Sequence, residues 1–168
     1  MESMEKYNAI SGPEAKEIIV AIIKGSDFGR LGLNDEKYPY VVPLNHVYFQ
    51  GGLILHGSFA GKKVELIKRN EFACYEIDYS IGDSNSITKT CHHEFKSAIL
   101  YGEICQVKSV EERREYLRTM AAEYGMPFKH GSEEKCNILF FKIQSASGRE
   151  GRFLSHEERV LYHYDFAE

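Results

Sequence analysis

The feature that most constrains the fold is a glycine pair, Gly51 and Gly52, that interrupts a long run of β-branched and aromatic residues. Paired glycines accept the positive φ angles that tight hairpin turns require. Residues 38–49 before the pair and 53–56 after it are rich in the residue types that favour strands. The pattern therefore predicts a β-hairpin, and with it an antiparallel sheet at the centre of the fold.

Four further segments are typical of strands and three are typical of helices. The expected strands are residues 28–33, 71–79, 94–108 and 137–146. The expected helices run from the capping pattern Ser11–Glu14 to Gly25, from Gly61 to Asn70, and from the capping box Ser109–Glu112 to Gly125. No strand-helix-strand pattern repeats, so the expected fold class is mainly β with flanking helices. About six antiparallel strands should close into a barrel, which leaves no edge unpaired.

One domain is expected over residues 1–147, followed by a tail at 148–168. A chain of 168 residues is long enough for a single core. The tail is rich in charges and histidines, so it is expected to lie outside the core and to pack on a partner subunit. Residues 80–93 contain a Gly-Asp-Ser-Asn-Ser run and are expected to form a loop between strands.

The charge balance argues against nucleic acid as a partner. The chain has 21 Lys and Arg against 25 Asp and Glu, a net charge of -4, and the signs mix along its length. No stretch approaches the roughly 20 apolar residues of a membrane span, and the first residues do not resemble a signal peptide. These features predict a cytoplasmic protein without membrane contact, whose four cysteines are reduced.

Two histidine patterns are not expected to carry chemistry. Cys91-His92-His93-Glu94 contains metal-ligand residue types, but neighbouring side chains on an extended strand point to opposite faces and do not converge on one ion. No metal site is therefore expected. His46 lies in an otherwise apolar strand and is expected to be a satisfied barrel residue rather than a catalytic one.

The densest chemical pattern runs from His56 to Lys63, where a strand is expected to end and a basic helix to begin. Free backbone N–H groups at a helix start, the positive end of the helix dipole and two ammonium groups all favour a phosphate. The glycine spacing does not match a Walker-type phosphate loop. Taken alone, Gly61-Lys62-Lys63 fits a solvated basic turn at least as well as an anion site.

The order of these motifs resembles the pyridoxamine-phosphate-oxidase-like flavoproteins and, within them, the nitroimidazole-resistance-type reductases. The shared pattern runs from Pro39–Leu44 through a glycine-containing turn to His56-Gly57 and Gly61-Lys62-Lys63. It covers about residues 10–147. The resemblance implies an FMN-binding split β-barrel that works as a homodimer, with the flavin at the subunit interface.

The resemblance also implies roles for particular residues. Lys62 and Lys63 match the basic pair that holds the FMN phosphate. His56 ends a strand beside the ribityl chain and the ring, so it is the candidate catalytic residue. The other implied cofactor contacts are Val42, Pro43, Leu44, Asn45, Gly57, Ser58, Gly61 and Ser97.

The implied function is that of an FMN-dependent oxidoreductase. Electrons would pass from a reduced nicotinamide or similar donor to a small nitroaromatic or quinone-like acceptor. The chain has no Trp and lacks the strand Arg of the true pyridoxamine phosphate oxidases, so vitamin B6 oxidation is not expected. Two alternatives stay open: a non-catalytic flavin- or haem-binding protein that uses His156 and His163, and a deazaflavin-dependent reductase on the same fold.

Overall fold

A computed structural model describes residues 8–81, 95–151 and 160–167. Most of the expected 80–93 loop, the Cys91–Glu94 cluster and His156 lie outside the described residues. In chain order the elements are β1 (Asn8–Ser11), α1 (Pro13–Lys24), β2 (Phe28–Leu33), β3 (Tyr40–Phe49), β4 (Gly52–Gly57), α2 (Lys62–Arg69), β5 (Phe72–Ser80), β6 (Phe95–Gln106), α3 (Val110–Glu123), α4 (Ser132–Lys135), β7 (Asn137–Gly151) and β8 (Val160–Asp165).

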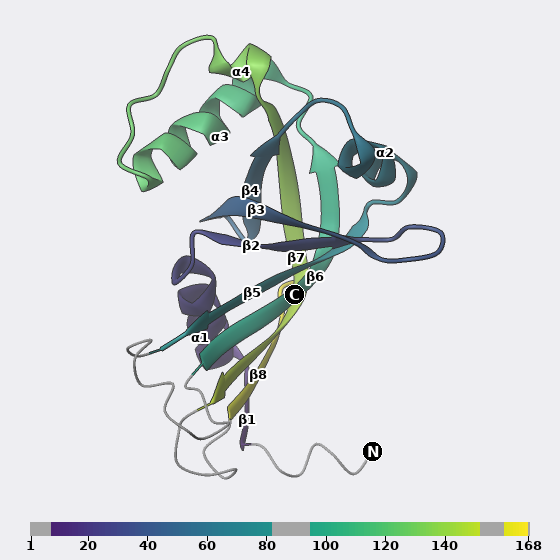
Figure 1. The fold of residues 1–168 in the computed structure, drawn as a ribbon. Helices are drawn as coiled ribbons and strands as arrows, with labels where there is room; N and C mark the ends of the chain where they lie inside the picture. Colours follow the sequence, from purple (N-terminus) through teal and green to yellow (C-terminus); the bar gives the residue numbers. More distant parts are fainter. Residues whose placement is uncertain (1–7, 82–94, 152–159, 168) are drawn as a thin grey trace.

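Six of the strands form a closed antiparallel barrel (Figure 1). The neighbours around the ring are β7, β4, β3, β2, β5 and β6, and β6 pairs again with β7 to close it. Every pairing within the ring is antiparallel. The expected barrel of six antiparallel strands is confirmed. Within it, β3 pairs with β2 through residues 40–45 and with β4 through residues 46–49.

The barrel is split along β7. Residues 137–142 of this strand pair with β4, whereas residues 145–150 pair with β8. β6 pairs with both halves and has a register shift between Tyr101 and Gly102. A Cβ at Gly102 would collide with the backbone carbonyl of Lys142, so glycine is required where β7 changes its neighbour.

The expectation that the chain after residue 147 lies outside the core is wrong for the described part. β7 continues to Gly151, and β8 pairs antiparallel with β7 and parallel with β1. Tyr162 of β8 is 4% exposed and packs in the main core, whereas its neighbour His163 is exposed. Because side chains alternate along a strand, a segment with many polar residues can still supply one face of a core. Packing of this segment on a partner subunit stays a prediction.

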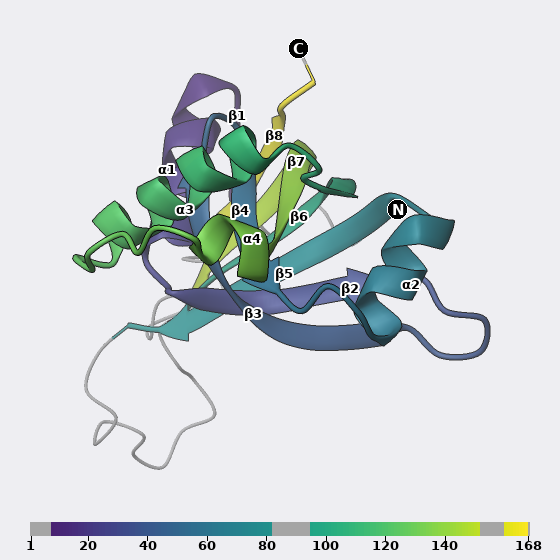
Figure 2. The ribbon, with the colours of Figure 1, turned by 90° about the horizontal axis from the view of Figure 1, so that it is seen from above.

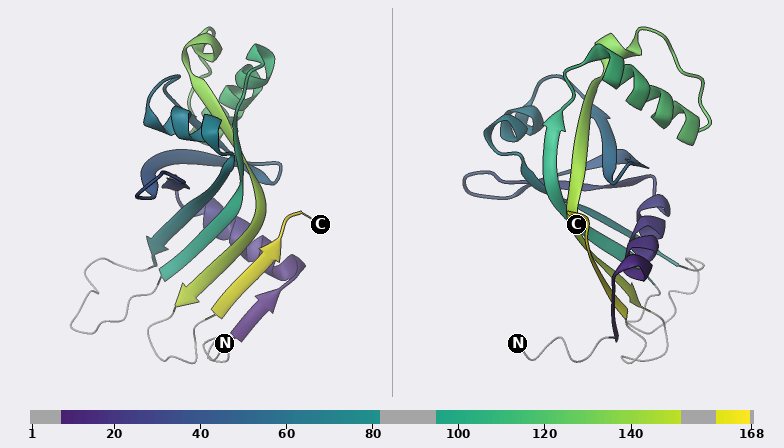
Figure 3. Two further views of the ribbon diagram at one scale, coloured as in Figure 1. Left: turned by 90° about the vertical axis from the view of Figure 1, so that its right-hand side faces the viewer. Right: turned by 180° about the vertical axis from the view of Figure 1, so that it is seen from behind.

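The helices cover different parts of the barrel. α1 packs its apolar stripe beside β8 and β1, which continue the sheet beyond β7 (Figure 3). It begins after Gly12 without a side-chain cap, so the expected capping pattern at Ser11 does not form. α3 is capped as expected, since the Ser109 side chain accepts from the Glu112 N–H at 3.2 Å.

α3 packs on the outer face of the barrel over a second, smaller core, well apart from α2 (Figure 2). Its Met120 contributes to that core together with Val47, Ile54, Val107 and Ile138. Within the part of the chain that the structure describes, no helix combines the length and apolar character needed to cross a membrane.

Candidate functional site

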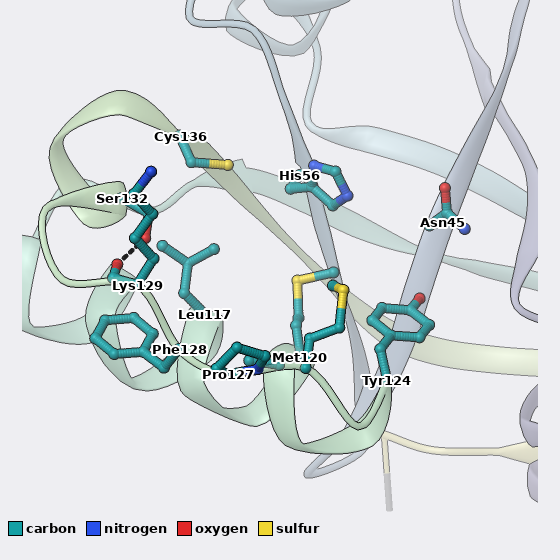
Figure 4. Close-up of a pocket in the computed structure, with 12 residues that line it drawn as sticks. Asn45, His56, Leu117, Met120, Tyr124, Pro127, Phe128, Lys129, Ser132 and Cys136 are labelled. Carbon is teal, nitrogen blue, oxygen red and sulfur yellow. Dashed lines mark hydrogen bonds between the residues drawn. The ribbon is translucent and has the colours of Figure 1, made fainter.

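Asn45 of β3 and His56 of β4 line one cavity on the outer side of the barrel. The ladder between the two strands ends at His46 and Leu55, so each of these residues lies one position beyond its last pair. Both side chains are exposed and line the same cavity (Figure 4). Val42 and Leu44 instead pack against the main core, so only their backbone faces outward.

Lys63, in the first turn of α2, lies beside Gly57. A Cβ at Gly57 would stand 2.6 Å from the Lys63 Nζ, so glycine leaves the space that the ammonium group fills. Burial lowers the pKa of Lys63. Desolvation by the surrounding protein lowers the pKa of His56, and the positive charge of Lys63 lowers it further.

Among the described residues, no carboxylate forms an ion pair with Lys63. A half-buried cation without a counter-charge favours the binding of an anion, because the anion replaces the hydration that the ammonium group has lost.

Lys62 has a different environment, although it is the preceding residue. Its Nζ forms an ion pair with the Asp35 carboxylate at 2.6 Å and lies 5.4 Å from the centre of the Tyr40 ring. This contact lowers the pKa of Asp35 and raises the pKa of Lys62. The two lysines that the sequence treats as a pair are therefore unequal, since an anion must compete with Asp35 for Lys62.

The turn from β4 to α2 is held by a buried residue that the sequence did not single out. Asn137 is fully buried; its side-chain amide donates to the Ser58 carbonyl at 2.9 Å and accepts from Gln106 Nε2 at 2.9 Å. Gly61 precedes α2 with φ of 108°, a backbone conformation that favours glycine. The sequence does contain one hint of this role, a polar residue at the start of an apolar strand.

Ser97 is not brought to this site within one chain. It pairs with Asp78 of β5 and Arg149 of β7, whereas the end of β6 nearest His56 is Gln106. Ser97 lies about 30 Å along the strand from Gln106, given the rise of a strand residue. The other predicted residues gather where β3, β4 and α2 meet, and Ser97 does not.

A cavity of about 550 Å³ opens beside Asn45 and His56, between the barrel and α3 (Figure 4). The helix and the loop after it supply an apolar wall, which is formed by Leu117, Met120, Ala121, Met126, Pro127 and Phe128. The remaining lining residues are Tyr124, Lys129, Ser132 and Cys136. The sequence places several of the α3 residues on an apolar stripe, but nothing in it shows that this stripe borders a cavity.

Most polar groups of the cavity are already hydrogen-bonded within the protein. The Tyr124 hydroxyl donates to the His46 carbonyl at 2.9 Å, and Asn45 Nδ2 donates to the Asp27 carbonyl at 3.2 Å. The Ser132 hydroxyl donates to the Lys129 carbonyl. Among the described residues, none hydrogen-bonds to the His56 ring, which is therefore available to a ligand. Its lowered pKa favours the neutral imidazole, which has one donor and one acceptor nitrogen.

His46 is a satisfied barrel residue, as expected from the sequence. Its ring is buried and lies 3.2 Å from the Tyr75 hydroxyl through Nδ1 and 2.9 Å from the Ile23 carbonyl through Nε2. Over residues 8–81, 95–151 and 160–167, no group of three or more His, Cys, Asp or Glu is arranged to hold a metal ion.

An exposed apolar surface adjoins the site and is here called the outer sheet face. It consists of Phe28, Val41, Ile99 and Tyr101, which point outward from β2, β3 and β6. Val41 is 58% exposed and Tyr101 is 49% exposed. Phe28 pairs directly with Asn45, so this surface reaches the edge of the cavity. These apolar side chains share the face with Arg30 and Glu76, which form an ion pair. Large exposed apolar side chains on one face of a sheet are a feature of interfaces.

Solved structures with the same fold carry several functional descriptions. A Bacteroides thetaiotaomicron protein named for 5-nitroimidazole antibiotic resistance is 24% identical, with a TM-score of 0.70 over 79% of this chain and 82% of that one. An FAD-binding protein from Mesorhizobium loti is 19% identical, with a TM-score of 0.62 over 81% and 94%. The flavocytochrome Anf3 from Azotobacter vinelandii is 16% identical, with a TM-score of 0.65 over 88% and 77%. At these identities the likeness shows the fold alone.

The family comparison is more specific. No curated protein matches the chain. The family model described as pyridoxamine 5'-phosphate oxidase, however, matches residues 15–150, which include every residue of the site. Because this match spans most of the sequence, the chain belongs to the pyridoxamine 5'-phosphate oxidase family.

Proposed function

We propose that this protein is an FMN-dependent oxidoreductase that acts as a homodimer in the cytoplasm. The observation that carries the proposal is the half-buried Lys63, which has no counter-charge among the described residues and lies between Gly57 and the start of α2. A phosphate there would meet the ammonium group and the N-terminal end of the helix together. Two fold neighbours, which are named as an FAD-binding protein and a flavocytochrome, support a flavin as the ligand.

The residues around Lys63 fit an extended cofactor that has a phosphate at one end. From Lys63 the site continues past Gly57 and Ser58 to His56, Asn45 and the backbone of Val42, Pro43 and Leu44. Lys62 would contribute by sharing its charge between Asp35 and the phosphate. When bound, the flavin supplies two-electron transfer between a nicotinamide donor and a nitroaromatic or quinone-like acceptor.

His56 would orient the acceptor and hold a proton close to it. Its ring has no hydrogen-bond partner among the described residues, it faces the cavity, and its lowered pKa favours the neutral form at pH 7. The true pyridoxamine phosphate oxidase reaction is not proposed, because the Trp and the strand Arg associated with it are absent from the sequence.

A second subunit would complete the site. The outer sheet face supplies an apolar surface beside Asn45, and obligate interfaces commonly bury more than about 2,000 Å². Within one chain Ser97 lies away from His56, so its predicted contact with the cofactor would come from the partner. The described part of the C-terminal segment adjoins the same face, since Leu161 pairs with Arg149.

The identity of the bound group tests the proposal. The purified protein should show flavin absorption bands, and mass spectrometry of the released cofactor should give the mass of FMN. If the measured mass is that of FAD or of a deazaflavin, that cofactor takes the place of FMN in the proposal. A haem spectrum would support the alternative that uses His163, whose side chain is exposed on β8. This alternative is in line with the flavocytochrome among the fold neighbours. A colourless protein that takes up no added flavin would refute it.

Reactivity gives a second test. Under anaerobic conditions NADH or NADPH should bleach the bound flavin, and a nitroaromatic or a quinone should restore its colour. Failure of both nucleotides to bleach it would refute the proposed donor. A fully reduced protein that no acceptor reoxidises would show that the flavin is not used for this reaction.

A further inference from the structure

His46 and Tyr75 form a buried polar pair that the proposed function does not use. Both side chains are buried, and their rings meet edge to face with centroids 5.4 Å apart. The pair connects two backbone carbonyls. His46 Nε2 lies 2.9 Å from the Ile23 carbonyl, and His46 Nδ1 lies 3.2 Å from the Tyr75 hydroxyl. That hydroxyl donates to the Leu44 carbonyl at 2.6 Å, so the three contacts form one chain.

The chain has three contacts but only two hydrogens while His46 is neutral. A neutral imidazole carries one N–H, a phenol carries one O–H, and a carbonyl only accepts. The contact with the Ile23 carbonyl therefore requires the hydrogen on Nε2, and the contact with the Leu44 carbonyl requires that of Tyr75. The contact left without a hydrogen joins Nδ1 to the phenol oxygen, and it is the longest of the three.

A second proton on His46 would complete the chain. Placed on Nδ1, it would donate to the Tyr75 oxygen while both carbonyls keep their donors. Burial raises the pKa of Tyr75, so the phenol keeps its hydrogen. Burial also lowers the pKa of His46, which favours the neutral ring at pH 7 as long as no further negative charge is close.

The charges that surround the pair leave room for such a change. The charge of Asp27, which precedes β2, partly offsets the effect of burial on the pKa of His46. Arg30 of β2 and Glu76 of β5 act on the phenol and pair with each other at 3.1 Å. Tyr124 of α3 donates to the His46 backbone carbonyl rather than to the ring. Among the described residues, no carboxylate forms an ion pair with the ring, so a charge brought by a ligand can decide its protonation.

From this arrangement we infer that His46 is a buried proton acceptor, which takes up one solvent proton at Nδ1 when negative charge arrives along the backbone of Val42, Pro43 and Leu44. The inference rests on the proposed function for the source of this charge. The hydride that leaves the nicotinamide donor carries two electrons and a net negative charge into the site, and the proton on His46 offsets that charge. Reoxidation returns the proton to solvent. Tyr75 is the positioning residue, because its oxygen accepts the new N–H.

Nuclear magnetic resonance of the histidine ring nitrogens tests where the hydrogens lie. In the ¹⁵N-labelled protein as purified, the His46 ring should be neutral at pH 7 with its hydrogen on Nε2. In an acid titration the second proton should appear on Nδ1. A neutral ring with its hydrogen on Nδ1, or a ring that is doubly protonated at pH 7, would overturn the inference.

Two tyrosines supply a matched pair of variants, because each places its hydroxyl on a different part of His46. Tyr75→Phe removes the acceptor for the new N–H, so it should lower the proton affinity of the ring by at least about 10-fold. Tyr124→Phe removes only the hydroxyl that bonds the backbone carbonyl and should leave the proton affinity nearly unchanged. Equal effects of the two substitutions would show that Tyr75 does not hold the proton and would overturn the inference.

The reduction potential of the bound flavin measures the proton that accompanies the electrons. In a two-electron couple each additional proton moves the potential by about 30 mV per pH unit. The potential of the wild type should therefore fall with rising pH more steeply than that of His46→Gln, by up to about 30 mV per pH unit within the range of pH about 5 to 8. The Gln amide can still donate to the Ile23 carbonyl but takes up no proton.

The outcomes of the two measurements are separable. Equal slopes for the wild type and His46→Gln would overturn the inference and leave the proposed function intact. If Tyr75→Phe does not fold, this comparison decides the inference in its place. A protein that binds no flavin would refute the proposed function, and the titration of the ring nitrogens would still decide whether His46 accepts a proton at Nδ1.

Discussion

Replacement of Lys63 by Ala should weaken FMN binding much more than replacement of Lys62 by Ala. Lys63 is half-buried, its pKa is lowered by burial, and it has no carboxylate partner within the described chain. Lys62 is exposed and already paired with Asp35 at 2.6 Å. A phosphate would therefore gain a full contact from Lys63 and only a shared one from Lys62.

The expected magnitudes follow from these environments. A hydrogen bond to a charged group contributes roughly 1.5 to 3 kcal/mol, so Lys63→Ala should raise the Kd for FMN by about 10- to 150-fold. An exposed ion pair contributes about 0 to 1 kcal/mol. Because Asp35 competes with the phosphate for Lys62, Lys62→Ala should raise the Kd for FMN by less than about 5-fold. Asp35→Asn should release Lys62 and tighten FMN binding by a similar small factor.

Quenching of flavin fluorescence on titration into the cofactor-free protein measures these constants. Riboflavin is the control ligand, because it has the isoalloxazine ring but no phosphate. Its affinity should be lower than that of FMN for the wild type and should change by less than a factor of two in either lysine variant. If Lys63→Ala leaves the Kd for FMN within a factor of two, or if Lys62→Ala has the larger effect, the phosphate does not bind where we place it.

Four further outcomes are expected. Asn137→Ala should cost about 1 to 3 kcal/mol in urea unfolding, because it removes a fully buried amide together with its hydrogen bonds to the Ser58 carbonyl and Gln106 Nε2; a loss below about 0.5 kcal/mol would contradict that role. The pKa of His46 is lowered in the folded state, mainly by burial. Below pH about 6.5 the unfolded chain therefore binds a proton that the folded chain excludes, and the stability decreases as the pH is lowered. His46→Gln should flatten the pH dependence of the melting temperature between pH 7 and 5, and an unchanged slope would exclude His46 as its source. Tyr101→Lys on the outer sheet face should convert the proposed dimer to a monomer in sedimentation experiments, and a persistent dimer would place the interface elsewhere. His56→Ala should alter the flavin spectrum or acceptor turnover with little change in melting temperature, since the side chain is exposed; unchanged spectrum and turnover would argue against its role.

The sequence by itself determined most of the barrel. The Gly51-Gly52 turn, the strand predicted over residues 38–49 and the helix start at Gly61 depend on a few neighbouring residues, and all three are present in the structure. Antiparallel hairpins also follow from local features, because short connections between strands allow little else. The β2–β3 and β3–β4 pairings were predictable for this reason, whereas the β2–β5, β4–β7 and β6–β7 pairings that complete the ring join segments distant in sequence.

The tertiary structure decided where the short terminal strands lie. Asn8–Ser11 and Val160–Asp165 are strands because each pairs with a segment distant in sequence. Neither segment is apolar enough to indicate burial, and Tyr162 enters the core only because β7 extends to Gly151 and carries β8 onto α1. The charge content of residues 148–168 therefore led to the prediction of a tail, whereas the structure has the end of β7 and β8 in this segment.

The structure also decided which candidate residues share one site. Adjacency on the chain suggested that Lys62 and Lys63 are equivalent, but Asp35 reaches only the first of them. The fold brought Asn45 and His56 to one cavity and left Ser97 at the far end of β6. The apolar stripe of α3 became a cavity wall because the helix docks only partly on the barrel. Local preferences act over a few residues, whereas a binding site depends on contacts between segments that only the folded chain brings together.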